Sequence, residues 1–390
     1  MRFIILSLFT LLTLTLNAQF VSPEKIAREI AAASPRLKSA IAAAEVERAK
    51  SITEGNLPDP EIEGEFLVAP AGEQNRWGAG ISWGLEWPGV YAARKNVNSH
   101  VAAALDWKAR SEEREVNIQI RQFLLDYILQ TKEITVVKSI LATTDSIFIL
   151  TSKALKGGET TLLDLNKLSV EKISLESRIA ALSDQRDEIV SSISSLAGKD
   201  MKSRMDSLEN EFPNLILPSE NDLKTLSANL PAIKQAEAEL ESARSNRKLV
   251  SRESLPGISF GYRHAFEDGN HFNGATLGLT IPLFSNKGKK SAAAAGVKAA
   301  EMELEYQKSM SETDIVSSLR RISLLQDEIN KISSVIEKTD NQSLLLKAYN
   351  EKIITLIDFL NERNYFLEAT LSLLELRHRA ASALLPLLNY

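Results

Sequence analysis

The 390-residue sequence contains no cysteine and only four histidines. The lack of cysteine excludes thiol catalysis, cysteine-ligated zinc and N-terminal lipidation through cysteine. The patterns G-x-x-x-x-G-K-[ST], H-E-x-x-H and G-x-S-x-G are also missing, which argues against the common phosphate-binding, metalloprotease and hydrolase sites. We therefore expect no enzyme, no cofactor and no metal site, although His264 and His271 flank the acidic Glu267 and Asp268.

Basic charge is not in excess. The formal net charge is −5 and 25% of the residues are charged, so bulk charge gives no support for nucleic acid as a partner. Residues 1–18 carry Arg2, an apolar run over residues 3–16 and Ala18. This pattern predicts a secretory signal peptide and an exported protein. No later apolar run approaches the ~20 residues of a membrane-spanning helix, so we expect no such helix in the mature chain.

Glycine and proline are absent from residues 90–156, which predicts one very long helix. Further helices are predicted over residues 162–197, 289–350 and 356–388. Apolar residues recur every seven positions, which is typical of supercoiled helices. The clearest series is Ile120, Tyr127, Ile134, Leu141, Phe148 and Leu155. At ~1.5 Å per residue the longest helix would extend roughly 100 Å, so it bridges a distance, as the helix of a soluble coiled-coil spacer also would.

The chain repeats itself after about 195 residues. Pro88 and Pro282 are 194 positions apart, and so are Asp164 and Asp358. Pro35 and Pro231, each at the start of a predicted helix, are offset by 196. A repeat of this kind is one structural unit used twice. We assign residues 19–198 to the first repeat, 199–229 to a connector and 230–390 to the second repeat.

Each repeat contains one predicted β-hairpin, over residues 60–87 and 257–284, in which apolar and polar residues alternate. Strands of roughly 8–11 residues with one apolar and one polar face suit a tilted crossing of a bilayer. Four strands cannot close a barrel, because bacterial barrels begin at about eight, and hydrocarbon tolerates no open sheet edge. Three copies would supply twelve strands. Two hairpins in a soluble protein remain the alternative.

The alternation assigns each side chain to one of two faces. The predicted lipid-facing residues are Phe66, Trp77, Trp83, Trp87, Phe260, Leu277 and Leu279. The predicted lumen-facing residues are Glu61, Glu63, Glu65, Ser82, Glu86, Arg263 and Thr276. The four glutamates would make such a lumen acidic.

Three local segments carry a resemblance to a known family. They are the alanine-rich helix that opens at Ser34 and Pro35, the Leu57-Pro58-Asp59-Pro60 entry to the first strand, and the Leu196-Ala197-Gly198 end of a helix. In this order, and with the repeat, the mature chain resembles the TolC-like outer-membrane efflux proteins.

The resemblance implies a mainly α fold with membrane β-structure. Long coiled-coil helical hairpins and four β-strands per chain would trimerise into a 12-stranded barrel and an α-helical periplasmic tunnel. It further implies a homotrimer surrounded by outer-membrane lipid, with a periplasmic adaptor protein and an inner-membrane pump as partners. The connector would contribute to a collar around the tunnel.

Two helix ends are candidates for the periplasmic tip of that tunnel. Gly157 and Gly158 end one helix, and Thr161 with Asp164 begins the next as a capping-box-like pair. Thr355 and Asp358 repeat the pair, but Lys352 stands where the first repeat has Gly158, so the second turn is less clearly marked. The aspartates either cap helices or form a ring of carboxylates that attracts cations.

The sequence therefore predicts the passive outer-membrane duct of a tripartite efflux system, with metal cations, drugs or other small molecules as cargo. A type I secretion channel would have the same architecture. A periplasmic coiled-coil spacer or adaptor without a barrel is the alternative from another class.

Overall fold

In the computed structural model of the chain, the described residues are 20–53, 55–284, 286–336 and 341–388. The predicted signal peptide lies outside them. The helices are α1 (Pro23–Ala33), α2 (Pro35–Thr53), α3 (Pro88–Lys156), α4 (Leu162–Ala197), α5 (Lys202–Asp206), α6 (Glu220–Asn229), α7 (Pro231–Arg252), α8 (Lys289–Ile336), α9 (Asn341–Asn350) and α10 (Leu356–Leu384). The strands are β1 (Glu61–Leu67), β2 (Arg76–Leu85), β3 (Gly257–Glu267) and β4 (Asn270–Thr280).

Two of the predicted helices differ from the observed ones. The segment 289–350 comprises α8 and α9, on either side of residues 337–340, which lie outside the described residues. The helix predicted over 356–388 ends at Leu384 and continues as a 3₁₀ turn, Leu385–Leu387. Pro386 explains this end, because proline has no N–H to donate to the preceding turn of an α-helix.

The chain divides into two compact units, and each takes segments from both repeats. The first comprises Met1–Ser34, Ile120–Asn214 and Ile329–His378, and the second comprises Pro35–Gln119, Leu215–Glu328 and Arg379–Tyr390. Because α3, α8 and α10 each contribute to both units, the units do not coincide with the repeats.

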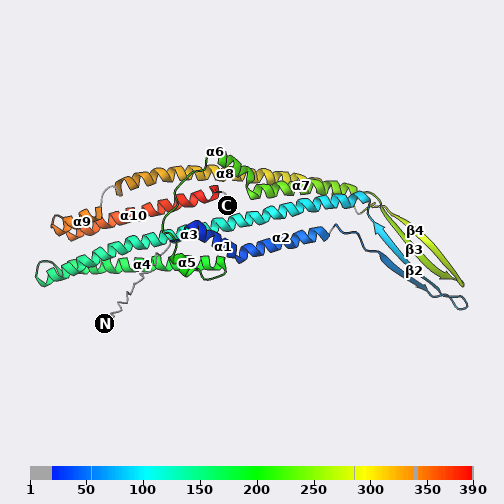
Figure 1. Cartoon of the computed structure of the whole chain (residues 1–390), viewed down its shortest axis with the longest axis horizontal. Coiled ribbons are helices and arrows are strands. Elements are labelled where there is room, and N and C mark those ends of the chain that lie inside the picture. The colour runs from blue at the N-terminus through cyan, green and yellow to red at the C-terminus, as the bar shows by residue number, and fades with distance from the viewer. Residues whose placement is uncertain (1–19, 54, 285, 337–340, 389–390) are drawn as a thin grey trace, which may run out of the picture. The chain divides into compact units, whose positions relative to one another are not determined.

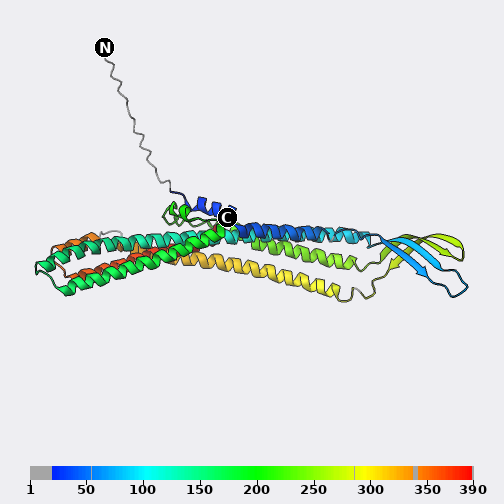
Figure 2. The same cartoon turned by 90° about the horizontal axis from the view of Figure 1, so that it is seen from below.

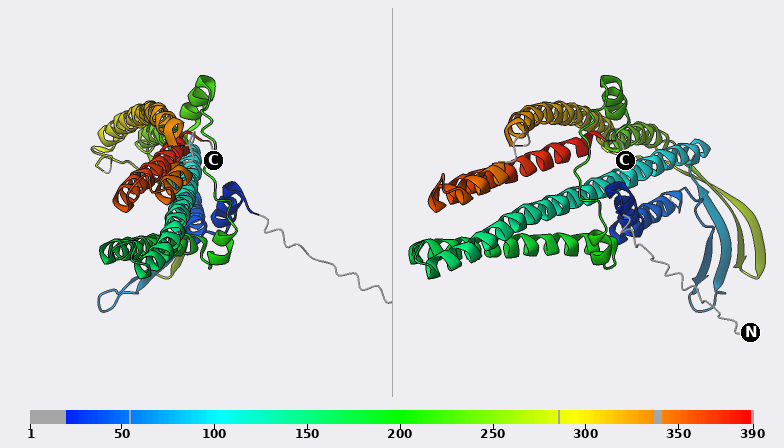
Figure 3. Two further views of the ribbon diagram at one scale, coloured as in Figure 1. Left: turned by 90° about the vertical axis from the view of Figure 1, so that its left-hand side faces the viewer. Right: turned by 60° about the vertical axis from the view of Figure 1, so that its left-hand side comes forward.

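In the first unit, the carboxyl-terminal part of α3 pairs with α4, and α9 pairs with α10. The turns of the two hairpins lie at the same end of the unit (Figure 1; Figure 3). Val137 and Ile140 of α3 pack with Leu175 of α4 and Leu367 of α10. Leucine and isoleucine at heptad spacing thus bury one stripe of each helix between the hairpins.

The second unit contains the β-sheet, shown as arrows in Figure 2. All four strands are antiparallel in the order β1-β2-β3-β4. Its helices are joined by small apolar clusters, such as Val90 and Ala93 of α3 with Leu249 of α7. Arg114 of α3 donates hydrogen bonds to the carbonyl oxygens of Leu388 and Pro386 at 2.9 and 2.6 Å.

The turn between β3 and β4 fixes their register. Glu267 pairs with Asn270, and the two residues between them, Asp268 and Gly269, have φ angles of 50° and 77°. Two positive φ values in a two-residue turn match the twist of a hairpin, and Asp-Gly is a favoured sequence for it. Gly261 lies where β3 passes close to β2, since a Cβ there would be 2.5 Å from the carbonyl oxygen of Ile81.

One stretch of α3 resembles a membrane-spanning helix in length and composition. An 18-residue window of α3 is long and apolar enough to cross a membrane by composition. The window belongs to a helix whose buried residues pack against α4 and α10 in the first unit. The heptad-spaced apolar residues that build this packing also raise the hydropathy of the window.

Candidate functional site

The register of the sheet separates apolar from polar side chains, because directly paired residues of antiparallel strands share a face. On one face, Trp83 pairs with Phe260, which in turn pairs with Leu277. On the other, Glu63 pairs with Gly80, which pairs with Arg263. Glu86 and Trp87 lie beyond the end of β2, so the sheet does not position these two predicted site residues.

The apolar face of the sheet is exposed in the single chain. Leu277 is 83% exposed, and the other apolar side chains at or above 40% include Phe66, Trp77, Ile81, Phe260 and Leu279. Trp83 is held in place by a hydrogen bond from its Nε1 to the carbonyl oxygen of Pro58 at 2.7 Å and by edge contact with Phe260. A contiguous exposed apolar surface of this kind marks an interaction with lipid or protein.

Near the hairpin turns, the same face carries a polar cluster. Asn273 Oδ1 accepts a hydrogen bond from the hydroxyl of Tyr262 and lies 2.7 Å from His264 Nδ1. His264 Nε2 lies 3.3 Å from His271 Nδ1, and Trp77 packs against the His264 ring. The two histidines therefore contact one another, and across residues 20–53, 55–284, 286–336 and 341–388 no group of three or more potential ligands could hold a metal ion.

The polar face is less acidic than its glutamates suggest. Glu65 forms an ion pair with Arg263 across β1 and β3. Beyond the strand, Glu86 forms an ion pair with Arg94 at 2.8 Å. Two of the four glutamates predicted for the lumen are thus neutralised within the chain, which leaves Glu61 and Glu63 as the main source of negative charge from that set.

Both outer strands of the sheet have one unpaired edge. Within the described part of the chain, β1 is bonded only to β2, and β4 only to β3. An exposed edge is a template for pairing with another strand. In the described part of the chain, the sheet thus has two unpaired edges and one exposed apolar face.

The turn between α3 and α4 combines a glycine with a threonine cap. Gly158 has a φ of 73°, and Glu159 N–H donates to the carbonyl oxygen of Ala154 at 2.9 Å, which is the hydrogen bond of a Schellman end. Thr161 Oγ1 accepts from the N–H of Asp164 at 3.2 Å and lies 2.7 Å from Asp164 Oδ2. Gly157 precedes this turn and takes part in the final helical hydrogen bonds.

The turn between α9 and α10 has the same geometry without glycine. Lys352 occupies the left-handed position with a φ of 57°, and Ile353 N–H donates to the carbonyl oxygen of Ala348 at 2.9 Å. Asp358 N–H donates to Thr355 Oγ1, while Thr355 N–H donates to Asp358 Oδ2, both at 3.2 Å. This is a reciprocal capping box. The chain therefore turns here, although Lys352 replaces glycine.

The cap hydrogen bonds favour the ionised form of both aspartates. The Thr161 hydroxyl holds the pKa of Asp164 below its ordinary value, and the Thr355 hydroxyl does the same for the pKa of Asp358. Because folding lowers these pKa values, their stabilising effect is present above about pH 4 and is lost as the pH falls through the lowered values. Both carboxylates therefore carry charge whether they act as caps or attract ions.

Arg363 of α10 lies near the two turns and was not identified from the sequence. It is 2% exposed, donates to Thr144 Oγ1 of α3 at 2.7 Å and forms an ion pair with Glu171 of α4. Burial lowers the pKa of Arg363, opposed by the charge of Glu171. One buried cation thus connects three helices, and no local sequence pattern distinguishes it from an exposed helical arginine.

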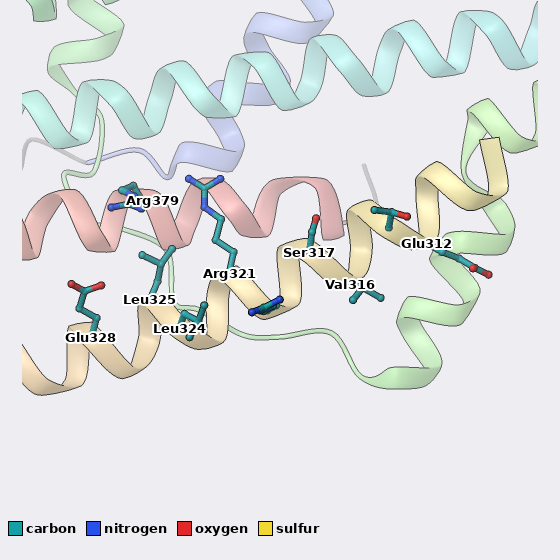
Figure 4. A pocket seen from close by; sticks show the side chains of 10 residues that line it. Glu312, Val316, Ser317, Arg321, Leu324, Leu325, Glu328 and Arg379 are labelled. Carbon is teal, nitrogen blue, oxygen red and sulfur yellow. The ribbon is translucent and has the colours of Figure 1, made fainter. Parts of the chain in front are cut away.

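A groove of about 760 Å³ lies between α8 and α10 in the second unit (Figure 4). Arg321 of α8 and Arg379 of α10 lie along it with the apolar Leu324, and Glu328 lies at one end. Its open shape and mixed charge do not select a ligand.

The similarities of this chain to known proteins come from solved structures. No protein-family model matches the sequence, and no curated protein matches it. A membrane protein from Pseudomonas aeruginosa has a TM-score of 0.77 at 15% identity, with 94% of this chain and 92% of that chain covered. The outer membrane protein VceC from Vibrio cholerae has a TM-score of 0.76 at 16% identity, with 94% of each chain covered.

CusC, a protein that forms a transmembrane channel, has a TM-score of 0.75 at 16% identity, with 95% of this chain and 93% of that chain covered. The identities are low, so the likeness concerns the fold. The predicted fold class, long helical hairpins with four strands per chain, is confirmed. This chain has the fold of the TolC-like outer-membrane channels.

Proposed function

We propose that the chain forms a trimeric outer-membrane channel and serves as the passive exit duct of a tripartite efflux system. The observation that carries the proposal is the four-stranded sheet, which has an exposed apolar face, a polar opposite face and two edges that no described residue pairs with as a further strand. In a trimer, β4 of each copy would pair with β1 of the next, and the barrel would close with no free edge.

The structural neighbours support this proposal. One is described as an outer membrane protein and another as a transmembrane channel, and a further one as an open-state outer membrane channel. Within this proposal, the trimer is surrounded by outer-membrane lipid and is joined by a periplasmic adaptor to an inner-membrane pump. A duct of this kind needs no catalytic residues.

The polar face would line the lumen, with Glu61, Glu63, Ser82 and Thr276 facing water. Because Arg263 neutralises Glu65, the remaining charge gives only a modest preference for cations. The cargo class that fits is metal cations or other small molecules. A type I secretion channel would share the architecture, whereas a spacer without a barrel would leave the apolar face exposed to water, which is unfavourable.

The first experiment is to test whether the mature protein is an SDS-resistant trimer in outer-membrane fractions and conducts in a planar bilayer. We expect channels with a weak cation preference in the reversal potential. A soluble monomer or dimer without conductance would refute the channel and favour the spacer.

The two helix turns supply the proposed periplasmic mouth, where three copies would place Asp164 and Asp358 in carboxylate rings. Replacement of both by asparagine keeps a side-chain oxygen that can accept the hydrogen bond of the capping box and removes the charge. We expect a lower cation preference at unchanged trimer stability. Unchanged selectivity with a less stable trimer would show that the two residues act only as helix caps.

A further inference from the structure

The apolar face does not stop where β4 ends. Its alternation continues beyond Thr280 through Ile281 to Leu283, and Leu283 and Phe284 are 73% and 85% exposed. This segment belongs to the second unit and leads into α8. Exposed apolar side chains therefore extend past the end of the strand, toward the start of α8.

Three exposed lysines, Lys287, Lys289 and Lys290, follow this apolar segment directly. No ion pair is found for any of them among the residues that the structure describes, and the first acidic residue of α8 is Glu301. Cations near the amino-terminal end of a helix oppose its dipole. Helix stability therefore does not explain three lysines at this place.

The first repeat has a different arrangement at the corresponding boundary between strand and helix. Its half-buried Arg94 forms ion pairs with Glu86 at 2.8 Å and with Glu253 at 3.4 Å. The charge of Arg94 is thus matched within the chain, and one exposed lysine, Lys95, lies beside it. In the second repeat, by contrast, the cluster of Lys287, Lys289 and Lys290 leaves its positive charge available to an external anion.

We propose that this lysine cluster binds the headgroups of anionic phospholipids in the leaflet that adjoins the helical end of the sheet. The proposal rests on the proposed membrane barrel. The order along the chain matches the order in a leaflet, since Leu283 and Phe284 would contact acyl chains and the ammonium groups would meet phosphates. Basic residues immediately outside an apolar segment attract anionic lipid through this combination.

The test uses the full trimer in nanodiscs of phosphatidylethanolamine, with and without phosphatidylglycerol. The affinity for phosphatidylglycerol is measured by native mass spectrometry, and the thermal midpoint of the trimer is measured in parallel. Each lysine near an anionic surface contributes ~1 kcal/mol, so the combined Lys287→Gln, Lys289→Gln and Lys290→Gln variant should bind this lipid roughly 100-fold more weakly. It should also lose the rise in thermal midpoint that phosphatidylglycerol gives the native protein.

The matched control removes the same number of exposed lysine charges further along α8, as Lys298→Gln, Lys308→Gln and Lys331→Gln. We expect this variant to keep the lipid preference, which should weaken in high salt for both the control and the native protein. Equal phosphatidylglycerol affinity in the two triple variants would overturn the proposal, and so would a native trimer that conducts but binds both lipids equally. A native chain that does not enter bilayers or conduct would instead refute the channel itself.

Discussion

A charge placed at Leu277 tests the membrane assignment of the apolar face most directly. Leu277 is 83% exposed in the single chain, so Leu277→Lys removes few contacts and should leave the fold of the isolated chain intact. It lies within β4 and in register with Phe260, which pairs with Trp83. The charge would therefore enter the middle of the apolar band.

The expected cost follows from this position. A lysine on the lipid face near the bilayer midplane costs ~2–4 kcal/mol. Three copies would bring roughly 6–12 kcal/mol to one barrel, which is comparable with the whole stability of many folded proteins. Thr276→Lys is the matched control, because it adds the same charge one residue away on the polar face.

The assay is refolding of urea-denatured protein into lipid vesicles, followed by tryptophan fluorescence and by the yield of SDS-resistant trimer. We expect Leu277→Lys to reduce the trimer yield strongly and Thr276→Lys to leave it nearly unchanged. Circular dichroism of the isolated chains should show equal helix content. Equal trimer yields for the two variants, whether high or low, would contradict the assignment of the faces.

Three further changes test the helical part of the first unit by thermal or urea unfolding. Lys352→Gly should stabilise the chain by about 1 kcal/mol, because it relieves a left-handed backbone at a φ of 57°; a loss of stability would mean that the lysine side chain contributes contacts of its own. Arg363→Met should cost about 3 kcal/mol by leaving Glu171 without its buried partner, and Glu171→Met in the same chain should recover most of that. Glu133→Gln should stabilise the protein at neutral pH, since burial and then Glu375 raise the pKa of Glu133 above 4.5. A raised pKa favours the protonated form of Glu133 in the folded state. The free energy of unfolding of the native protein should therefore rise relative to that of the variant as the pH falls toward about 4.5. Parallel pH profiles of the two free energies would refute this.

Local periodicity predicted the faces of the sheet correctly, because strand alternation depends only on neighbours in the sequence. Trp77 and Trp83 were assigned to one face, and the register places them beside Phe266 and Phe260. Contact of the apolar face with lipid is part of the proposed function.

The heptad pattern was informative for the long helices for a similar reason. In the predicted series, Ile120, Tyr127 and Ile134 are buried, whereas Leu141, Phe148 and Leu155 are half-buried. The repeat of seven selects one stripe of a helix before any partner is known.

Contacts between distant segments could not be predicted in the same way. His378 Nε2 lies 2.6 Å from Asp126 Oδ1 in the first unit, although 252 positions separate them in the sequence. Arg363 and Thr144 are 219 positions apart. Polar residues on a long helix look alike in sequence, whether they face solvent or an opposing helix, so only the packing of α3 against α10 distinguishes them.

The two repeats share backbone features but differ in side chains, both at the helix turns of the first unit and at the boundary between strand and helix in the second unit. At the helix turns, Gly158 and Lys352 adopt the same left-handed conformation although only glycine does so without strain. At the boundary between strand and helix, Arg94 forms ion pairs within the chain, whereas Lys287 forms none with the residues that the structure describes. In a trimer, a ring of such positions would contain three from the first repeat and three from the second. The two kinds of site would therefore alternate around the ring. Substitutions confined to one repeat would then change three of the six positions in a ring, so the contribution of each repeat to lipid binding and to ion selectivity is separable by experiment.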